Sequence, residues 1–69
     1  MKISARNTLR GKVVKISEGA VNTEVLLELT GKAKIVSMIS KESAKKLGLK
    51  PGKKAYAIIK ASSVMTAVD

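Results

Sequence analysis

The sequence predicts an all-β domain in which five strands are interrupted once by a short helix. Apolar and polar residues alternate with a period of two over most of the chain, which is the pattern of half-buried strands. This period is broken only around residues 40–48, where helix signals replace it. Turn-forming residues separate the alternating runs. At 69 residues, the chain is long enough for one domain.

Three strands are predicted before the helix. Residues 9–16 alternate apolar and basic residues and then slip in phase at Val13 and Val14, which predicts a β-bulge or sharp coil. Residues 21–29 place Val, Thr or Leu at every odd position and therefore present one apolar face. A tight turn at Gly31 leads to the third strand, residues 33–39.

The helix and the last two strands follow. Ser40 is a suitable N-cap, and Gly48 stands where a helix of two turns would end. The run "KPG" at 50–52 has the Pro-Gly order of a type II turn. Residues 54–61 and 63–68 are the predicted fourth and fifth strands. Five twisted strands with one short helix between the third and fourth are the layout of an OB-like barrel.

Composition narrows the ways in which so small a core can be stabilised. The chain has no cysteine and no histidine, so disulfides and thiolate zinc sites are excluded, and only five acidic residues could bind a metal directly. Oligomerisation is the remaining common remedy for a marginal core. No signal peptide, transit segment or membrane-spanning run is present, which predicts a cytoplasmic protein without a membrane partner.

The net charge of +9 predicts a polyanionic partner, but it leaves the class of partner open. An enzyme is disfavoured because general acid–base chemistry has no histidine to use and the serines have no base beside them. A nucleic-acid-binding OB-type module is the alternative, although Tyr56 is the only aromatic residue on which a base could stack. A purely structural assembly domain would instead pair Arg6 and Lys60 with carboxylates such as Glu42.

A small oxyanion is the third class of partner, and it needs hydroxyl, amide and cationic donors that converge. The stretch "SARN" supplies such a mixture before the first strand, and "KASS" supplies another after the fourth. The helix start adds serine hydroxyls. The corresponding residues are Ser4, Arg6, Asn7, Lys60, Ser62, Ser63, Ser40 and Ser43.

Taken together, these stretches resemble the molbindins, which are small molybdate-binding proteins built from one Mop domain. The matching motifs are "SARN.L.G.V" at 4–13, "EGAVN.EV" at 18–25, "I.KES...LGL..G" at 39–52 and "AIIKASSV" at 57–64. The resemblance covers nearly the whole chain and implies a single Mop domain over residues 1–69. It also implies a hexamer, a trimer of dimers, that holds molybdate or tungstate between subunits for storage, buffering or homeostasis of molybdenum.

The resemblance also implies two kinds of binding site, with no cofactor, no metal bound directly by side chains and no nucleic acid. A site at the dimer interface would use both polar stretches of one chain and the helix start of its partner. The implied residues are Ser4, Arg6, Asn7, Lys60, Ala61 through its backbone, Ser62, and Lys41 and Ser43. A site near a threefold axis would use the motif "GAVN", which comprises Gly19, Ala20, Val21 and Asn22.

Overall fold

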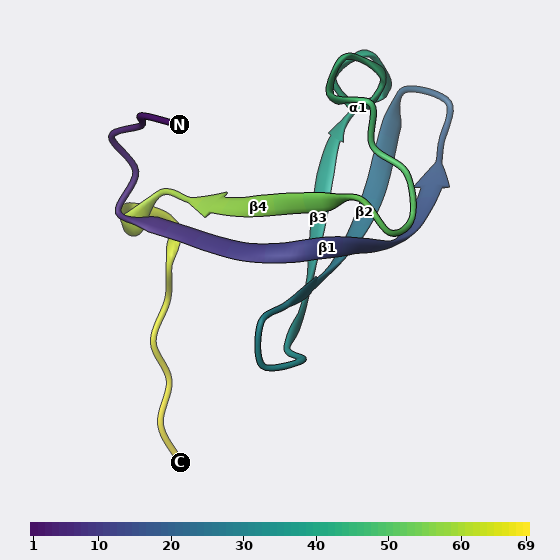
Figure 1. Ribbon diagram of the computed structural model, residues 1–69. Coiled ribbons are helices and arrows are strands. Elements are labelled where there is room, and N and C mark those ends of the chain that lie inside the picture. The colour runs from purple at the N-terminus through teal and green to yellow at the C-terminus, as the bar shows by residue number, and fades with distance from the viewer.

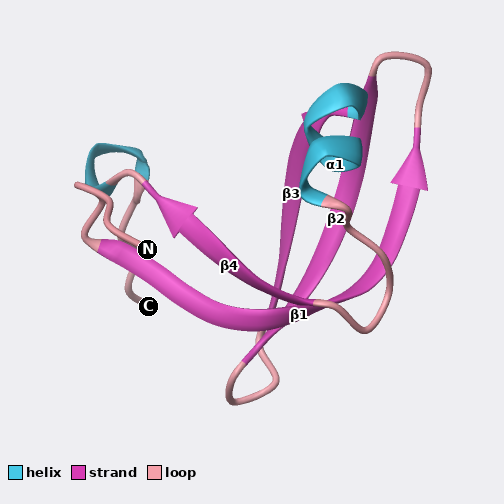
Figure 2. Cartoon of the chain, turned by 45° about the horizontal axis from the view of Figure 1, so that its top comes forward, coloured by secondary structure: helices cyan, strands magenta, loops and turns pink.

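One antiparallel sheet and one short helix make up the fold in the computed structural model, which describes residues 1–69. The elements in chain order are β1 (Asn7–Glu18), β2 (Asn22–Leu29), β3 (Lys34–Ser40), α1 (Lys41–Leu47), β4 (Lys54–Ile59) and the 3₁₀ turn η1 (Ala61–Ser63). The strands lie in the order β3-β2-β1-β4. The sheet curls into an OB-like half-barrel, and α1 lies over one end of it (Figures 1 and 2).

The long strand β1 makes the sheet curl because it is shared between two partners. Its first half pairs with β4 and its second half pairs with β2, and the two pairings overlap at Gly11 and Lys12. The register with β2 shifts between Val13 and Lys15, which confirms the predicted bulge at Val14. A bulge increases the local twist of a strand. The half of β1 beside β4 therefore turns away from β2 and β3.

The core lies on the concave face of the half-barrel and is very small. Only five residues are buried, namely Val13, Val25, Leu27, Ala57 and Thr23. The chain exposes 5735 Å², whereas a compact monomer of 7.3 kDa is expected to expose about 4,200 Å². The single chain therefore leaves about 1,500 Å² more surface in water than its mass requires.

Local signals in the sequence determine how α1 begins and ends. The Ser40 hydroxyl accepts a hydrogen bond from the Ser43 N–H at 3.0 Å, and Gly48 ends the helix in the left-handed conformation. Gly52 has a φ of 91°, and the Lys53 N–H donates to the Lys50 carbonyl at 3.1 Å. The predicted cap, helix end and type II turn are thus confirmed. No helix in the chain is long and apolar enough to span a membrane.

The predicted fifth strand, residues 63–68, is wrong for the isolated chain. β4 ends at Ile59 rather than 61, because Asn7 opposite Ile59 is the last paired residue of β1. The Ser63 N–H then donates to the Lys60 carbonyl at 2.9 Å, and this turn leads the chain away from the sheet. Residues 64–69 have no strand beside them and are exposed.

Thr23 is the one buried residue whose polar side-chain atom has no hydrogen-bond partner. Its side chain is 1% exposed, and its hydroxyl has no hydrogen-bond partner. Since a buried, unpaired hydroxyl costs about 1–3 kcal/mol, we expect Thr23→Val, which keeps the shape, to stabilise the protein by about 1 kcal/mol. Urea unfolding at a fixed chain concentration measures this gain. Thr8→Val, at an exposed position of β1, is the control, and an equal gain there would contradict the explanation.

Candidate functional site

The two polar stretches singled out in the sequence meet at one end of the β1–β4 ladder. Asn7 opposite Ile59 is the last pair of that ladder, so Ser4–Arg6 and Lys60–Ser62 follow directly beyond it. The Asn7 side-chain amide donates to the Ile59 carbonyl at 3.3 Å and ties the two stretches together. Figures 1 and 2 both place this end of the ladder away from α1.

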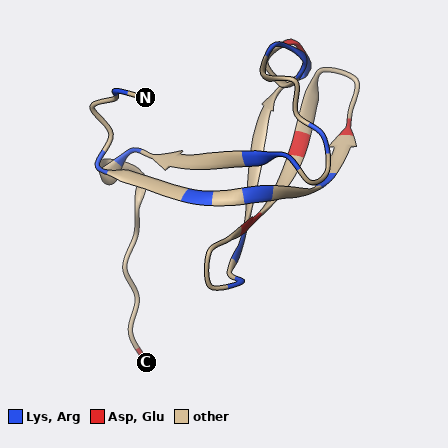
Figure 3. Ribbon diagram, in the orientation of Figure 1, with Lys and Arg blue, Asp and Glu red and all other residues tan.

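An open hollow of about 660 Å³ lies between these stretches. Its lining includes the predicted residues Ser4, Arg6, Lys60, Ala61 and Ser62. Two cations border the hollow, and no carboxylate does. Figure 3 shows blue but no red at this end of the ladder. The hollow is therefore electropositive, and its side chains are exposed and free to move toward a ligand.

The groups around this hollow are hydrogen-bond donors without partners in the chain. The hydroxyls of Ser4 and Ser62 make no hydrogen bond within the chain, nor do the N–H groups of Ala61 and Ser62 at the start of η1. The Arg6 guanidinium and the Lys60 ammonium donate only. Such a set suits a ligand that carries negative charge and accepts hydrogen bonds from several directions.

Asn7 differs from its neighbours in the motif. One N–H of its amide is already donated to Ile59, and its side chain is partly buried. Asn7 therefore positions the two stretches through an internal contact, and it does not line the hollow. The sequence alone could not distinguish this structural contact from a contact with a ligand.

The helix start does not share the hollow within one chain. Ser43 and Lys41 lie at the α1 end of the molecule, and Arg6 and Lys60 lie at the far end of the β1–β4 ladder (Figure 1). The Lys41 N–H, expected as a backbone donor, is already given to the Val21 carbonyl at 3.0 Å. A site that contains both groups would have to combine two chains.

At the helix start itself, two donors remain available. The Ser43 oxygen accepts a hydrogen bond from the Ser40 hydroxyl at 2.8 Å, which leaves the proton of the Ser43 hydroxyl for another acceptor. The Lys41 ammonium lies 3.9 Å from a carboxylate oxygen of Glu18 and is partly exposed. This long, exposed ion pair holds the ammonium only weakly.

The predicted second site, Gly19–Asn22, forms the turn between β1 and β2 and borders a separate hollow of about 480 Å³. The N–H groups of Ala20 and Val21 make no hydrogen bond, whereas the Gly19 N–H donates to the Asn22 carbonyl at 2.7 Å. Two carboxylates also border this hollow, namely Glu18 and Glu24. In a single chain, they make the turn less favourable for an anion than the first hollow.

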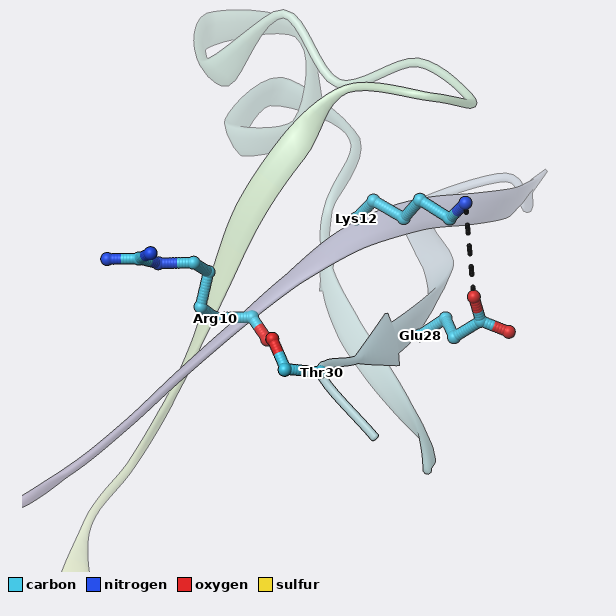
Figure 4. Close-up of polar contacts among 4 residues, drawn as sticks. All are labelled: Arg10, Lys12, Glu28 and Thr30. Atoms are coloured by element: carbon cyan, nitrogen blue, oxygen red, sulfur yellow. Dashed lines mark hydrogen bonds and ion pairs between the residues drawn. The ribbon is translucent and has the colours of Figure 1, made fainter. Parts of the chain in front are cut away.

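A third hollow, which the sequence reasoning missed, lies in the middle of β1. Arg10, Lys12 and Lys54 border it, and Lys12 stands directly opposite Lys54. The Lys12 ammonium lies 3.9 Å from a carboxylate oxygen of Glu28, and the dashed line in Figure 4 marks this pair. The Thr30 hydroxyl donates to the Arg10 carbonyl at 3.4 Å. The only signal in the sequence was the i, i+2 spacing of Arg10 and Lys12. Glu28 and the occupied hydroxyl make this hollow a weaker anion site than the first.

Carboxylate clusters are absent from the chain. No group of three or more His, Cys, Asp or Glu residues lies close enough together to hold a metal ion. The cations, hydroxyls and backbone amides around the first hollow are groups that can bind an anion.

Comparison with known proteins identifies relatives that are described as binding molybdenum compounds. The family model described as "TOBE domain" matches residues 3–66. A protein of Haemophilus influenzae called "probable molybdenum-pterin-binding protein" is 52% identical to this chain over 69 residues, which is all of both chains.

Two solved structures are also closely similar. MopII from Clostridium pasteurianum is 46% identical and superposes with a TM-score of 0.92, over 97% of this chain and 100% of the other. A form of ModG with molybdate bound, described as a cytoplasmic molybdate-binding protein, is 54% identical with a TM-score of 0.90. That match covers 94% of this chain but 46% of ModG.

Proposed function

We propose a function from one premise: this chain belongs to the TOBE domain family and, within it, to the molybdenum-pterin-binding proteins. Its function is the reversible binding of molybdate between the subunits of a homo-oligomer. Relatives support the ligand, because one similar structure is that of a molybdate-binding protein with molybdate bound. Intracellular storage, buffering or homeostasis of molybdenum in the cytoplasm is the role that such binding would serve.

The observation that carries this proposal is the meeting of two cations and several free donors in a hollow without a carboxylate. Molybdate is a tetrahedral dianion whose four oxygens only accept hydrogen bonds. Arg6 and Lys60 balance its charge, while the hydroxyls of Ser4 and Ser62 and the N–H of Ala61 fill acceptor positions. Donors of this kind offset the large cost of taking a dianion out of water. No covalent bond forms, so the ion can leave.

Tungstate has the same charge and shape as molybdate, so the same donors would hold it. Sulfate is also a tetrahedral dianion but is smaller. Discrimination against sulfate therefore depends on the size of the closed site, since the charge and the donor pattern do not differ. The hollow of a single chain is open, and a second subunit would set that size by closing it.

The homo-oligomer is supported by the surface of the single chain. About 1,500 Å² of excess surface exceeds the roughly 800 Å² that each partner buries in a standard interface. Large apolar side chains are exposed at both ends and on the outer face of β3, among them Met1, Val21, Val36, Met38 and Val68. More than one interface would be needed to cover them. A trimer of dimers has two kinds of interface, and in it the helix start of the partner would add Lys41 and Ser43 to the site.

The second proposed site is the Gly19–Asn22 turn near a threefold axis. The free N–H groups of Ala20 and Val21 are its donors. Three copies of the turn would bring six such groups together. The Lys41 ammonium, 3.9 Å from Glu18, would offset part of the nearby negative charge.

Calorimetry with molybdate at near-physiological salt tests the proposed function. We expect saturable binding at micromolar protein, with tungstate competing and sulfate competing far more weakly. The absence of saturation would contradict the proposal.

A gel shift with single-stranded RNA or DNA tests the alternative function. In that alternative the protein is a nucleic-acid-binding module, and Tyr56, which is 49% exposed, would be the only residue on which a base could stack. Tight, steeply salt-dependent nucleic-acid binding together with indifference to molybdate would favour that alternative.

A further inference from the structure

The third hollow, of about 340 Å³, lies beside a row of charged side chains that crosses the whole sheet. Each strand contributes one residue to this row, and residues directly opposite one another in an antiparallel ladder point to the same face. In the order β3, β2, β1 and β4, the residues are Lys34, Glu28, Lys12 and Lys54. The row therefore holds three cations and one carboxylate, and its charges do not balance within the chain.

Lys54 is the cation at the end of this row that has no counter-ion. The carboxylate of Glu28 lies 3.9 Å from the Lys12 ammonium, whereas Lys54 forms no ion pair. Its direct neighbour across the ladder is Lys12. Like charges that stand directly opposite each other destabilise a sheet. An anion bound between the two ammonium groups would remove this repulsion.

Arg10 and Tyr56 form the next cross-strand pair on the same face. They stand opposite each other, two residues along from Lys12 and Lys54, and side chains two residues apart in a strand share a face. Tyr56 is 49% exposed, whereas its neighbour Ala57 points into the core. The Arg10 guanidinium makes no hydrogen bond or ion pair, and Figure 4 shows it extended away from Lys12. A phenol ring and a guanidinium both stack on flat aromatic rings.

We propose that this outer face of β1 and β4 binds a phosphate monoester that carries a flat heteroaromatic ring, such as a nucleoside monophosphate. Lys12 and Lys54 hold the phosphate, which carries nearly two negative charges at neutral pH. The ring lies against Tyr56 and Arg10. The two pairs are about 7 Å apart along the strands, and the sugar bridges that gap. Glu28 makes the hollow weak for a bare anion, and the ring supplies the second contact.

The number of aromatic residues limits the ligand to a small molecule. Tyr56 is the only aromatic side chain in the protein, so a single ring can stack there. Proteins that bind single-stranded nucleic acids stack successive bases on several aromatic side chains along a groove. The cations of this face are also confined to one row and Arg10 beside it. A mononucleotide matches both limits.

The same face is expected to stay in water when copies of the chain associate. Lysine is depleted at the centre of protein interfaces, because burying its charge is costly. The exposed apolar side chains of the outer face that association would cover, such as Val36 and Met38, belong to β3. The proposed ligand therefore does not compete with the homo-oligomer.

Tyr56 itself provides a direct measurement of binding. The protein has no Phe, Trp or His, so the aromatic side-chain region of the NMR spectrum of the ¹³C-labelled protein contains the ring of Tyr56 alone. Titration with adenosine monophosphate should shift these signals and reach saturation. We expect inorganic phosphate and adenosine each to bind roughly tenfold more weakly, because each makes only one of the two contacts.

Lys54→Gln is the variant that tests the phosphate contact. It should weaken adenosine monophosphate binding roughly tenfold, while urea unfolding shows equal or higher stability because the like-charge pair is lost. Lys15→Gln is the matched control, since Lys15 is also exposed but does not border the third hollow. Its effect should stay below about twofold. Molybdate calorimetry on Lys54→Gln should be unchanged, because Lys54 does not border the electropositive hollow.

Four outcomes would overturn this proposal, and none of them bears on molybdate. Tyr56 signals that do not move with adenosine monophosphate would show that no ring lies there. Equal weakening by Lys54→Gln and Lys15→Gln would show that only the net charge matters. Inorganic phosphate that binds as tightly as the nucleotide would exclude a role for the ring. Oligoadenylates whose affinity rises with strand length would identify the face as a nucleic-acid surface instead.

Discussion

Arg6→Ala is expected to weaken molybdate binding by about 2–4 kcal/mol, which is a roughly 30- to 700-fold rise in Kd. Arg6 is one of only two cations that border the electropositive hollow. No carboxylate borders the hollow, so Arg6 is not needed there to neutralise a negative charge of the protein itself. The variant leaves a dianion opposite a single positive charge. It also removes the planar group that can donate two parallel hydrogen bonds to an oxyanion. The fold should be unaffected, because Arg6 lies before β1 and is exposed.

Titration calorimetry on both chains measures this change, and Lys15→Ala is the matched control. Lys15 is also an exposed cation, so its loss changes the net charge equally, but it does not border the hollow. Screening by salt should limit its effect to about twofold. Equal weakening by both variants would show that the bulk charge of the protein, and no defined site, attracts the anion.

The features of the fold that the sequence predicted correctly are those that neighbouring residues determine. Ser40 caps a helix because its own hydroxyl reaches the N–H three residues later. Gly48 and Gly52 stand where the backbone needs a positive φ, which glycine adopts without strain. The bulge at Val14 was visible as a slip in the alternation, because successive strand side chains face opposite sides of the sheet.

The fifth strand was wrong in the isolated chain because a strand needs a partner as well as a pattern. Residues 63–68 have the composition of a strand, but the ladder of β1 ends at Asn7 and leaves no edge beside them. The sequence records which residues suit a strand. It does not record whether the partner strand lies in the same chain.

The candidate site could be predicted in part, and its limits have physical causes. Ser4, Arg6, Lys60 and Ser62 border one hollow because both of their stretches continue from the last pair of the same ladder. That proximity depends on strand pairing, which alternation alone does not determine. The roles of these residues toward molybdate stay predictions.

Two other aspects of the site depended on side chains that are distant in the sequence. Asn7 proved to be bonded to Ile59, which lies 52 residues away. Glu24 borders the hollow of the Gly19–Asn22 turn because β2 runs back beside β1, and Glu18 borders it from the end of β1. The sequence of the Gly19–Asn22 motif indicates its backbone hydrogen-bond donors. It does not indicate that the fold places the carboxylates of Glu18 and Glu24 beside those donors.

The largest expected loss of stability comes from Gly11→Ala. Gly11 pairs with Leu29 of β2 and with Ala55 of β4, so it stands where the two halves of the sheet meet. A Cβ atom at this position would lie 2.5 Å from the Glu28 carbonyl oxygen and 3.2 Å from the Leu29 Cα. Both are backbone atoms, which cannot swing aside as a flexible side chain would. β1 and β2 would have to separate.

We expect this variant to lose about 3 kcal/mol, the upper part of the usual cost of overpacking. For a domain with five buried residues, such a loss is a large part of its total stability. Urea unfolding followed by circular dichroism at fixed chain concentration measures this loss.

Gly31→Ala is the control. Gly31 has a φ of 93°, but no atom lies within 4 Å of the place where its Cβ atom would be. It should lose only about 1 kcal/mol, from backbone strain. If both variants lost the same stability, strain at glycine and not the contact with Glu28 would explain the effect. If Gly11→Ala alone is severe, the close approach of β1 to β2 is what allows one strand to serve both halves of the barrel. The electropositive hollow would then also depend on this close approach, because Arg6 and Lys60 lie just beyond the end of the pairing between β1 and β4.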